Sequence, residues 1–534
     1  MLRRALSQNR EAAVADPGVG WAAPLICLLA SLPVALVTYV PANDYPFHSA
    51  RIAILSQLAD PVYDRFYDLG SLLLPNLGMD LVSLALAPAL GYDLASRLFV
   101  MLCLIAMMAG TVLLHRAAHD RWSVWPLLAS GLLFNGVFLF GFYSYLFGAG
   151  LALCAAALWL RIDAGPFRLL LTFVCAILLM LCHMEAFGIY ALLLSGFELH
   201  RAGLTLRAGL GWRSLRDLAL AALPFLAALA LLFLLSPTAE EAGNPIRYDG
   251  YWAAPLHGLL FSLSSTHVWL DALSWVALGL LAAGSAMLLG LRVNWPVMLG
   301  AAMLALAIAI LPGELLGSLY ADIRLGPVLA MSIIAGLDFA RPSRRVAAGF
   351  LAAVLLVTAA RTVFFVQTWR GFDAQIGRIV ESFDAMGEGA MLLVASMDRF
   401  PSRYLATPGV LAVWHPSLKH IGSYAAMRPC RCFVPMTFAD RTKQPLAVAP
   451  DFAAIKAFQG DRPLPLSGPA ALRTLLGEID RRRRDDWPEL AETYLLVMGG
   501  PESIRETLRA HGVIAASGPR HSLLRLPDVT ADKP

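Results

Sequence analysis

One short segment of the chain gathers three ionisable side chains within eight residues. The segment PANDYPFHSAR, residues 41–51, follows a long apolar run and holds Asp44, His48 and Arg51. If a helix begins near Pro46, Asp44 lies at its N-cap, His48 in its first turn and Arg51 about one turn later. A carboxylate at this place can take a proton, and a guanidinium can bind phosphate oxygens. From spacing alone, however, a capped helix with an interfacial histidine is the simpler interpretation.

Two further groups of candidate residues stand in short turns between apolar runs. His183 and Glu185 lie in the turn LCHME, where ionisable groups are costly unless they face water or a cavity. A hydrogen-bonded structural turn explains them as simply as a functional role. Tyr320 and Arg324 lie in the segment YADIRL at the start of another apolar run. A neighbouring acid, Glu314 or Asp322, is the expected partner of Arg324.

Cysteine and histidine usage points to no metal site. Cys430 and Cys432 form a C-x-C pair, and the spacing of structural zinc sites is absent. A disulfide between residues two apart is strained and uncommon, so we expect this pair to be reduced. His415 and His420 stand nearby, and we do not expect them to bind a metal.

The elements that must position these residues divide the chain into two regions with different solvents. The 534 residues are 58% hydrophobic and 15% charged, whereas soluble domains carry about 25% charged residues. Apolar runs fill residues 21–366, while residues 370–534 have an ordinary globular composition. We therefore predict an α-helical polytopic membrane protein with a short N-terminal tail, residues 1–20, and a soluble C-terminal domain. The net charge of +4 gives no reason to expect a nucleic-acid partner.

About eleven apolar runs are candidates to cross the bilayer. They are residues 21–40, 95–114, 124–141, 145–161, 168–183, 186–200, 217–235, 271–291, 295–311, 325–340 and 346–366. A twelfth stretch, residues 72–90, is apolar but contains Pro75, Asp80 and Pro88. We interpret it as a helix at the membrane interface.

Arginine-rich loops set the expected orientation. With the N-terminus in the cytoplasm, most loop arginines fall on the cytoplasmic side, as the positive-inside rule requires. Counting residues 72–90 as a span would reverse the loops that follow. The predicted location is therefore the bacterial inner (plasma) membrane, with residues 41–94 and 236–270 as outer loops and residues 370–534 in the periplasm.

The C-terminal region has the alternation of a small α/β domain. Short apolar runs at residues 391–395, 494–498, 513–516 and 523–526 are typical of strands. Residues 370–386 and 501–511 have helical spacing. Gly499 and Gly500 follow a strand but match no phosphate-binding pattern, so we interpret them as a turn.

Three short motifs resemble the glycosyltransferase C superfamily of polytopic membrane enzymes. They are NDYPFHSAR after the first span, LGYDLASRL at residues 90–98 and GFYSYLFG at residues 141–148. The resemblance covers residues 20–340. It implies sugar transfer from a polyprenyl-phosphate-linked donor at the outer face, with an acid in the first outer loop as general base or metal ligand. Asp44 matches that position.

The resemblance implies roles for the other candidates as well. Asp44 and His48 are the expected catalytic residues, while the expected substrate-binding residues are Arg51, His183, Glu185, Tyr320 and Arg324. The second outer turn contains no acid, and the Trp-Trp-Asp sequence of oligosaccharyltransferases is absent, which puts a divalent metal in doubt. No other cofactor is implied. The implied partners are the lipid-linked sugar donor, membrane lipids and a glycan, lipid or protein acceptor.

Two other functions fit a chain of this kind. A transporter or lipid-handling protein usually places ionisable residues within broken helices of repeated halves. Here these residues gather at outer helix ends, and we find no internal repeat. A catalytically inactive relative that serves as a scaffold stays open because the second acidic motif is missing.

Overall fold

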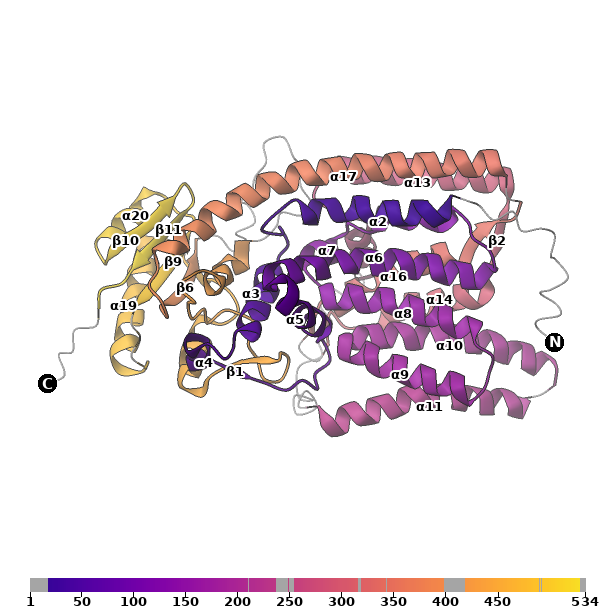
Figure 1. The fold of residues 1–534 in the computed structure, drawn as a ribbon, viewed down its shortest axis with the longest axis horizontal. Helices are drawn as coiled ribbons and strands as arrows, with labels where there is room; N and C mark the ends of the chain where they lie inside the picture. The colour runs from indigo at the N-terminus through magenta and orange to yellow at the C-terminus, as the bar shows by residue number, and fades with distance from the viewer. Residues whose placement is uncertain are drawn as a thin grey trace.

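The structure, a computed structural model, describes residues 18–209, 211–236, 248, 254–315, 318–341, 343–397, 418–488, 490 and 492–528. The N-terminal tail up to residue 17, residues 237–247 and 249–253 of the predicted loop 236–270, and His415 lie outside these ranges. A bundle of long helices forms one part of the molecule, and a smaller part with a β-sheet caps one end of it (Figure 1). We call this end of the bundle the domain-facing end.

Helices occupy all the predicted spans, which confirms the polytopic helical class. They are α2 (Val19–Ala35), α6 (Tyr92–His119), η1 (Trp125–Leu132), α7 (Gly136–Phe140), α8 (Tyr143–Arg161), α9 (Pro166–Cys182), α10 (Met184–Arg207), α11 (Gly211–Leu235), α13 (Val268–Leu289), α14 (Trp295–Ile310), α16 (Gly326–Gly336) and α17 (Arg344–Val380). Of these, α6, α8, α11, α13 and the helix beginning at Arg344 are long and apolar enough to cross a bilayer alone.

Two of these segments differ from the expected continuous spans. The run 124–141 is broken into η1 and α7, because Asn135 caps α7 by accepting a hydrogen bond of 3.0 Å from the Phe138 N–H. Conversely, α17 does not stop at residue 366. Its buried residues, among them Trp369 and Ile376, continue the helical spacing, so α17 runs through residue 370 into the smaller part.

The ambiguous stretch 72–90 forms a short helix, α5 (Gly78–Leu90). Its 13 residues span only about 20 Å, less than the roughly 30 Å of a hydrocarbon core. It lies beside α3 (Tyr45–Ser56) at the domain-facing end (Figure 1). This geometry agrees with a helix at the interface.

A buried ion pair joins α3 to α5. Arg51 Nε and Nη2 donate to the two carboxylate oxygens of Asp80 at 2.6 and 3.0 Å, and both side chains are almost entirely buried. Paired hydrogen bonds of this kind fix the relative position of the two helices. Because Asp80 balances the charge of Arg51, we interpret Arg51 as a structural residue.

Glycines allow the closest helix contacts in the bundle. A Cβ at Gly150 of α8 would meet the backbone of α6, and one at Gly196 of α10 would meet the Gly300 backbone of α14. Small residues let membrane helices approach in this way, since packing rather than the hydrophobic effect holds them together in lipid.

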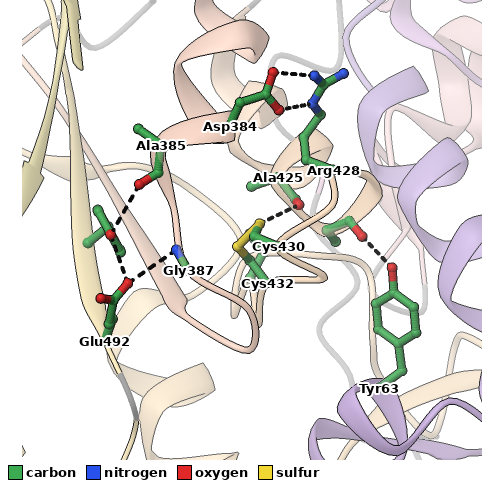
Figure 2. Close-up of a disulfide and its surroundings, with 12 residues drawn as sticks. Tyr63, Asp384, Ala385, Gly387, Ala425, Arg428, Cys430, Cys432 and Glu492 are labelled. Carbon is green, nitrogen blue, oxygen red and sulfur yellow. Dashed lines mark hydrogen bonds and ion pairs between the residues drawn. A yellow bond between two sulfur atoms is a disulfide. The ribbon is translucent and has the colours of Figure 1, made fainter. Parts of the chain in front are cut away.

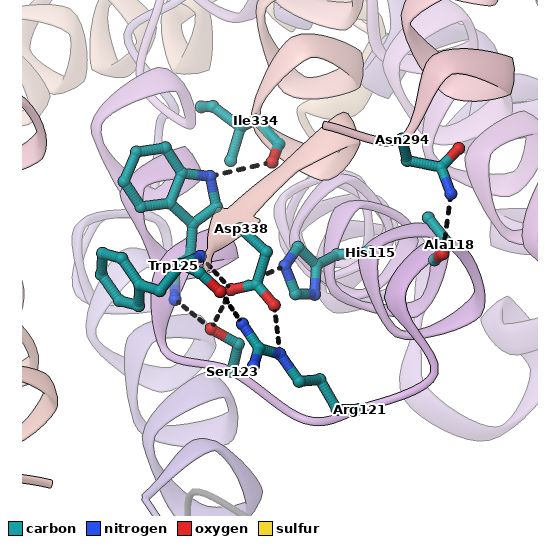
Figure 3. Close-up of polar contacts among 9 residues, drawn as sticks. His115, Ala118, Arg121, Ser123, Trp125, Asn294, Ile334 and Asp338 are labelled. Atoms are coloured by element: carbon teal, nitrogen blue, oxygen red, sulfur yellow. Dashed lines mark hydrogen bonds and ion pairs between the residues drawn. The ribbon is translucent and has the colours of Figure 1, made fainter. Parts of the chain in front are cut away.

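A polar cluster closes the opposite end of the bundle (Figure 3). There β2 (Leu291–Val293) pairs antiparallel with β5 (Leu337–Phe339). The carboxylate of Asp338 in β5 accepts from Arg121 Nε at 2.5 Å and from the Ser123 hydroxyl at 2.7 Å, and the His115 ring is 3.5 Å away. These contacts tie the loop after α6 to the loop between α16 and α17.

The smaller part contains a five-stranded mixed sheet, and four of its strands fall on the predicted runs. Its strand order is β10-β11-β9-β6-β8, with β6 parallel to β8 and β9 and the other pairs antiparallel. The strands are β6 (Met391–Ser396), β8 (Leu464–Pro465), β9 (Thr493–Met498), β10 (Val513–Gly518) and β11 (His521–Arg525). The helices of this part are α18 (Ala453–Gln459), α19 (Pro469–Asp485) and α20 (Glu502–Arg509), with the 3-10 segments η3 (Glu381–Ala385), η5 (Leu418–Met427) and η6 (Pro450–Phe452).

The predicted outer loop 41–94 is folded together with this smaller part. Here α4 (Pro61–Phe66) leads into β1 (Tyr67–Leu69), which pairs antiparallel with β7 (Leu446–Val448). The Tyr63 hydroxyl donates to the Ala426 carbonyl at 2.6 Å (Figure 2). Contacts distant in sequence therefore join the two parts.

Four further short elements are described. They are α12 (Ala254–Leu263), β3 (Glu314–Leu315), β4 (Ser318–Leu319) and α15 (Ala321–Arg324).

Cys430 and Cys432 form a disulfide (Figure 2), so the expectation of a reduced pair is wrong. The turn between them explains the difference. Arg431 adopts a left-handed conformation, with φ of 45°, and pairs with Asp60 and Glu388, which brings the two Cα atoms to 5.1 Å. That separation is within the range that a disulfide bridges.

The close approach of α10 and α14 predicts the behaviour of two alanine variants in one helix. Gly196→Ala places a methyl group against the Gly300 backbone, so we expect a lower unfolding temperature. Gly203→Ala is the matched control because nothing lies within 4 Å of its added Cβ. Since alanine is favoured over glycine by about 1 kcal/mol in helices, the control should be neutral or stabilising. Thermal unfolding in detergent measures both, and equal shifts would contradict the contact.

The buried pair Arg51–Asp80 leads to a second prediction. Asp80→Asn leaves the guanidinium buried without its charge partner, which should destabilise the protein by about 3–5 kcal/mol. The double variant Arg51→Met/Asp80→Leu removes both charges and should recover most of that loss. Chemical or thermal unfolding in detergent checks this order. A double variant no more stable than Asp80→Asn would argue against a purely structural pair.

Candidate functional site

Asp44 stands directly before α3, at the predicted N-cap position, but its side chain does not cap the helix. The backbone instead fixes its place: the N–H groups of Asn43 and Asp44 donate to the carbonyls of Leu139 and Phe140 at 3.1 and 3.0 Å. Gly141, with φ of 102°, allows this approach, since a Cβ there would lie 3.0 Å from Asp44 Cβ. The Asp44 carboxylate is thereby available for contacts outside its own helix.

The side-chain contact of Asp44 comes from the far end of the sequence. His420, in η5, places its Nε2 3.4 Å from Asp44 Oδ1. The His420 ring lies on Phe47, with centroids 3.6 Å apart, and Phe438 is 6.0 Å away on the same cluster. His420 is buried, whereas the Asp44 side chain keeps 13% of its surface exposed.

Burial controls the charge state of the groups around Asp44. It lowers the pKa of His420 to about 4, and the hydrogen bond to Asp44 opposes this only in part. Burial also lowers the pKa of the neighbouring Lys419, while the Asp44 charge raises it. At neutral pH, therefore, His420 is a neutral imidazole.

His48 lies in the first turn of α3, as predicted, and is buried. Its Nδ1 lies 3.1 Å from Arg51 Nη2, and its ring is 6.2 Å from that of Tyr143. Burial, followed by the charge of Arg51, lowers the pKa of His48 to about 3, although Asp44 opposes the shift. His48 thus extends the Arg51–Asp80 pair toward Asp44.

The remaining predicted residues meet in a second cluster. Arg324 Nη1 is 3.1 Å from Glu185 Oε1, and the guanidinium lies 3.9 Å above the Phe142 ring. Glu185, which is distant in sequence, is thus a partner of Arg324. His183 caps α10, since its Nδ1 accepts from the Glu185 N–H at 3.1 Å. The Tyr145 hydroxyl donates to the Arg324 carbonyl at 2.7 Å, and the Tyr145 ring is 5.5 Å from that of His183.

The segment Phe140–Phe142 connects the two clusters. Its Phe140 carbonyl receives the Asp44 N–H, and its Phe142 ring lies under Arg324. The two phenylalanine rings are stacked at 4.6 Å, and Tyr320, whose side chain is 43% exposed, contacts Phe140 at 5.2 Å. Asp44 and Arg324 therefore belong to one contiguous region at the domain-facing end.

The histidines of the predicted outer loop 236–270 do not extend this region among the residues that the structure describes. His267 caps α13 by accepting from the Leu270 N–H at 3.1 Å, and its ring packs on Phe364. The side chain of His257 lies outside the part of the chain that the structure describes. Within the described ranges, no three His, Cys, Asp or Glu side chains gather as they would around a metal ion. His420 is the residue that sequence reasoning missed, because no local pattern links it to Asp44.

Comparison with known proteins finds similarity in structure but not in sequence. No protein-family model matches the chain, and no curated protein is similar to it. Two crystal structures of ArnT from Cupriavidus metallidurans share its fold, both with a TM-score of 0.54. The ArnT structure bound to undecaprenyl phosphate is 12% identical to this chain in sequence, and the match covers 96% of this chain and 99% of the ArnT chain. The apo structure of ArnT is 11% identical in sequence, and the match covers 95% of this chain and 97% of the ArnT chain.

The matched regions span nearly the whole length of both proteins, including the smaller part with the sheet. At this identity the similarity concerns the fold alone. The chain therefore shares the fold of ArnT, in agreement with the resemblance in architecture that its short motifs indicate.

Proposed function

We propose that the protein is a membrane glycosyltransferase that transfers a sugar from a polyprenyl-phosphate-linked donor to a glycan, lipid or protein acceptor at the periplasmic face. The observation that carries the proposal is the contiguity of a partly exposed carboxylate, Asp44, with the cationic cluster around Arg324. Both lie against the segment Phe140–Phe142. ArnT, which has the same fold, was crystallised with undecaprenyl phosphate.

The reaction requires a base for the acceptor. The acceptor oxygen or nitrogen attacks the anomeric carbon, the bond from that carbon to the phosphate oxygen breaks, and its electron pair stays on the phosphate. The acceptor proton goes to the Asp44 carboxylate, which the backbone contacts with Leu139 and Phe140 hold at the start of α3. Positioned general bases contribute roughly 10²–10⁴-fold to the rate.

The reaction also requires a cation for the leaving phosphate. The Arg324 guanidinium has five N–H donors in a planar fork that matches phosphate oxygens. Contact with the Phe142 face and with Glu185 restricts its orientation, so little freedom is lost when phosphate binds. Tyr320 and His183 stand beside this cluster as further substrate contacts.

The membrane brings the donor to this end of the bundle. Large apolar side chains on α11 and α13 are exposed, among them Leu226, Phe233 and Leu280. Such surfaces suit the lipid chains of a bilayer. A polyprenyl chain would lie in the same layer and present its phosphate at the helix ends, near Arg324. Under the positive-inside rule, these ends face the periplasm.

The role of Asp44 predicts the activity of two variants in the same loop. Asp44→Asn removes the base while keeping the size of the side chain, so transfer should fall by about 10²–10⁴-fold. Asp64→Asn, on the exposed surface of α4, is the matched control and should keep wild-type activity. The assay measures transfer of radiolabelled sugar from polyprenyl-phosphate donors in membranes. Full activity in Asp44→Asn would refute the role of Asp44, and a wild type inactive with every donor would favour a scaffold.

The role of Arg324 gives a separate prediction. Arg324→Gln removes the cation that meets the phosphate and should lower kcat/KM by about 10²–10³-fold, with a higher KM for the donor. Arg324→Lys keeps the charge but not the paired donors and should lie between wild type and Arg324→Gln. Arg344→Gln, exposed at the start of α17 at the opposite end, is the control. An Arg324→Gln variant with unchanged KM and kcat would contradict phosphate binding.

A further inference from the structure

The segment η5 of the smaller part packs directly on α3, beside the candidate base. His420 lies on Phe47, and Tyr424 contacts Tyr39 edge-on at 5.0 Å. On the α3 side, the rings of Phe47 and His48 both contact Phe438, a second residue of the smaller part. The surroundings of Asp44 are therefore built from both parts of the chain.

We infer that His420 is a positioning residue for Asp44, so that the C-terminal part completes the active site. This inference rests on the proposed function and deepens it. Its basis is the contact between His420 Nε2 and Asp44 Oδ1 at 3.4 Å, together with the burial of His420 between Phe47 and Phe438.

A carboxylate at this position needs an orienting contact. Asp44 does not cap α3, so its own helix does not fix the direction of its side chain. An imidazole that donates its Nε2–H to one carboxylate oxygen leaves the other oxygen for the acceptor proton. The ring itself cannot turn freely because it is packed against Phe47. Hydrogen bonds at unoccupied sites are often long and tighten when substrate binds, as the separation of 3.4 Å allows here.

The geometry favours a positioning role over a role as the base. The second ring nitrogen, Nδ1, is buried and has no hydrogen-bond partner among the described residues. An acceptor could not reach it without displacing the ring from Phe47. Asp44, by contrast, keeps part of its surface exposed. Burial also keeps His420 neutral at pH 7, so it retains one N–H to donate throughout the reaction.

Two substitutions separate the hydrogen bond from the packing. His420→Phe keeps a flat ring on Phe47 but removes the donor, whereas His420→Gln keeps an N–H near the place of Nε2 but removes the ring. We expect His420→Phe to lower kcat by about tenfold to a hundredfold while KM for the donor changes little, because a misplaced base slows the chemical step. His420→Gln should recover most of the rate. His511→Phe, at the end of α20, is the control for the C-terminal part.

The outcomes of the activity assay are distinct. A kcat loss in His420→Phe with recovery in His420→Gln supports the positioning role. Full activity in His420→Phe, or equal losses in both variants, overturns it, since packing alone would then explain the contact. In either case an active wild type leaves the proposed function standing.

A second measurement does not depend on activity. Thermal unfolding in detergent is compared for the full-length wild type, Asp44→Asn, His420→Phe and the double variant. We expect the shifts in Tm to be non-additive, because residues in contact share one interaction that either single variant removes. Additive shifts overturn the contact. Non-additive shifts in a protein that transfers no sugar would confirm the contact but refute the proposed function and the positioning role with it.

Discussion

Two backbone hydrogen bonds determine where the candidate site can form. The N–H groups of Asn43 and Asp44 donate to the carbonyls of Leu139 and Phe140, and this joins the segment between α2 and α3 to the turn before α8. The same turn places Phe142 under Arg324. Because α7 ends at Phe140, its last carbonyls have no partner within the helix and can accept from this segment, which places Asp44 close to the residues around Arg324.

Much of the fold could be predicted from the sequence because membrane helices and buried strands leave long apolar signals. The helices follow the predicted runs, and β6 and β9 match the two most apolar stretches of the C-terminal region. The exceptions have local causes that hydropathy does not report. Asn135 caps α7, which therefore begins as a helix separate from η1. The helix α17 continues past residue 370 because its buried residues keep the helical spacing. A disulfide across one residue depends on the conformation of Arg431, which composition does not reveal.

The candidate site was only half visible in the sequence. Asp44 and Arg324 stand at helix ends, where ionisable groups in an apolar chain attract attention. Their partners are different in kind. Glu185 was a candidate, but its pairing with Arg324 depends on the packing of α10 rather than on sequence distance. His420 stands in an unremarkable polar stretch, and only the docking of η5 on α3 brings it to Asp44. Contacts between the two parts of the chain require the tertiary structure.

The buried arginines show how scaffold and site are divided. The Arg51 side chain is fully buried and donates to both Asp80 oxygens, so this ion pair joins α3 to α5. Arg361 also pairs with a carboxylate, that of Asp271, between α17 and α13, but through one oxygen, and its Nη2 donates to the Phe134 carbonyl. Arg324 combines an ion pair with an aromatic contact: its Nη1 lies 3.1 Å from a Glu185 carboxylate oxygen, its guanidinium lies over the Phe142 ring, and the Glu185 side chain retains 14% exposure. Paired hydrogen bonds to one carboxylate fix a guanidinium in both position and direction, as they do for Arg51. The same sequence thus uses buried arginines to join helices, and the proposed function adds phosphate binding to this role for Arg324.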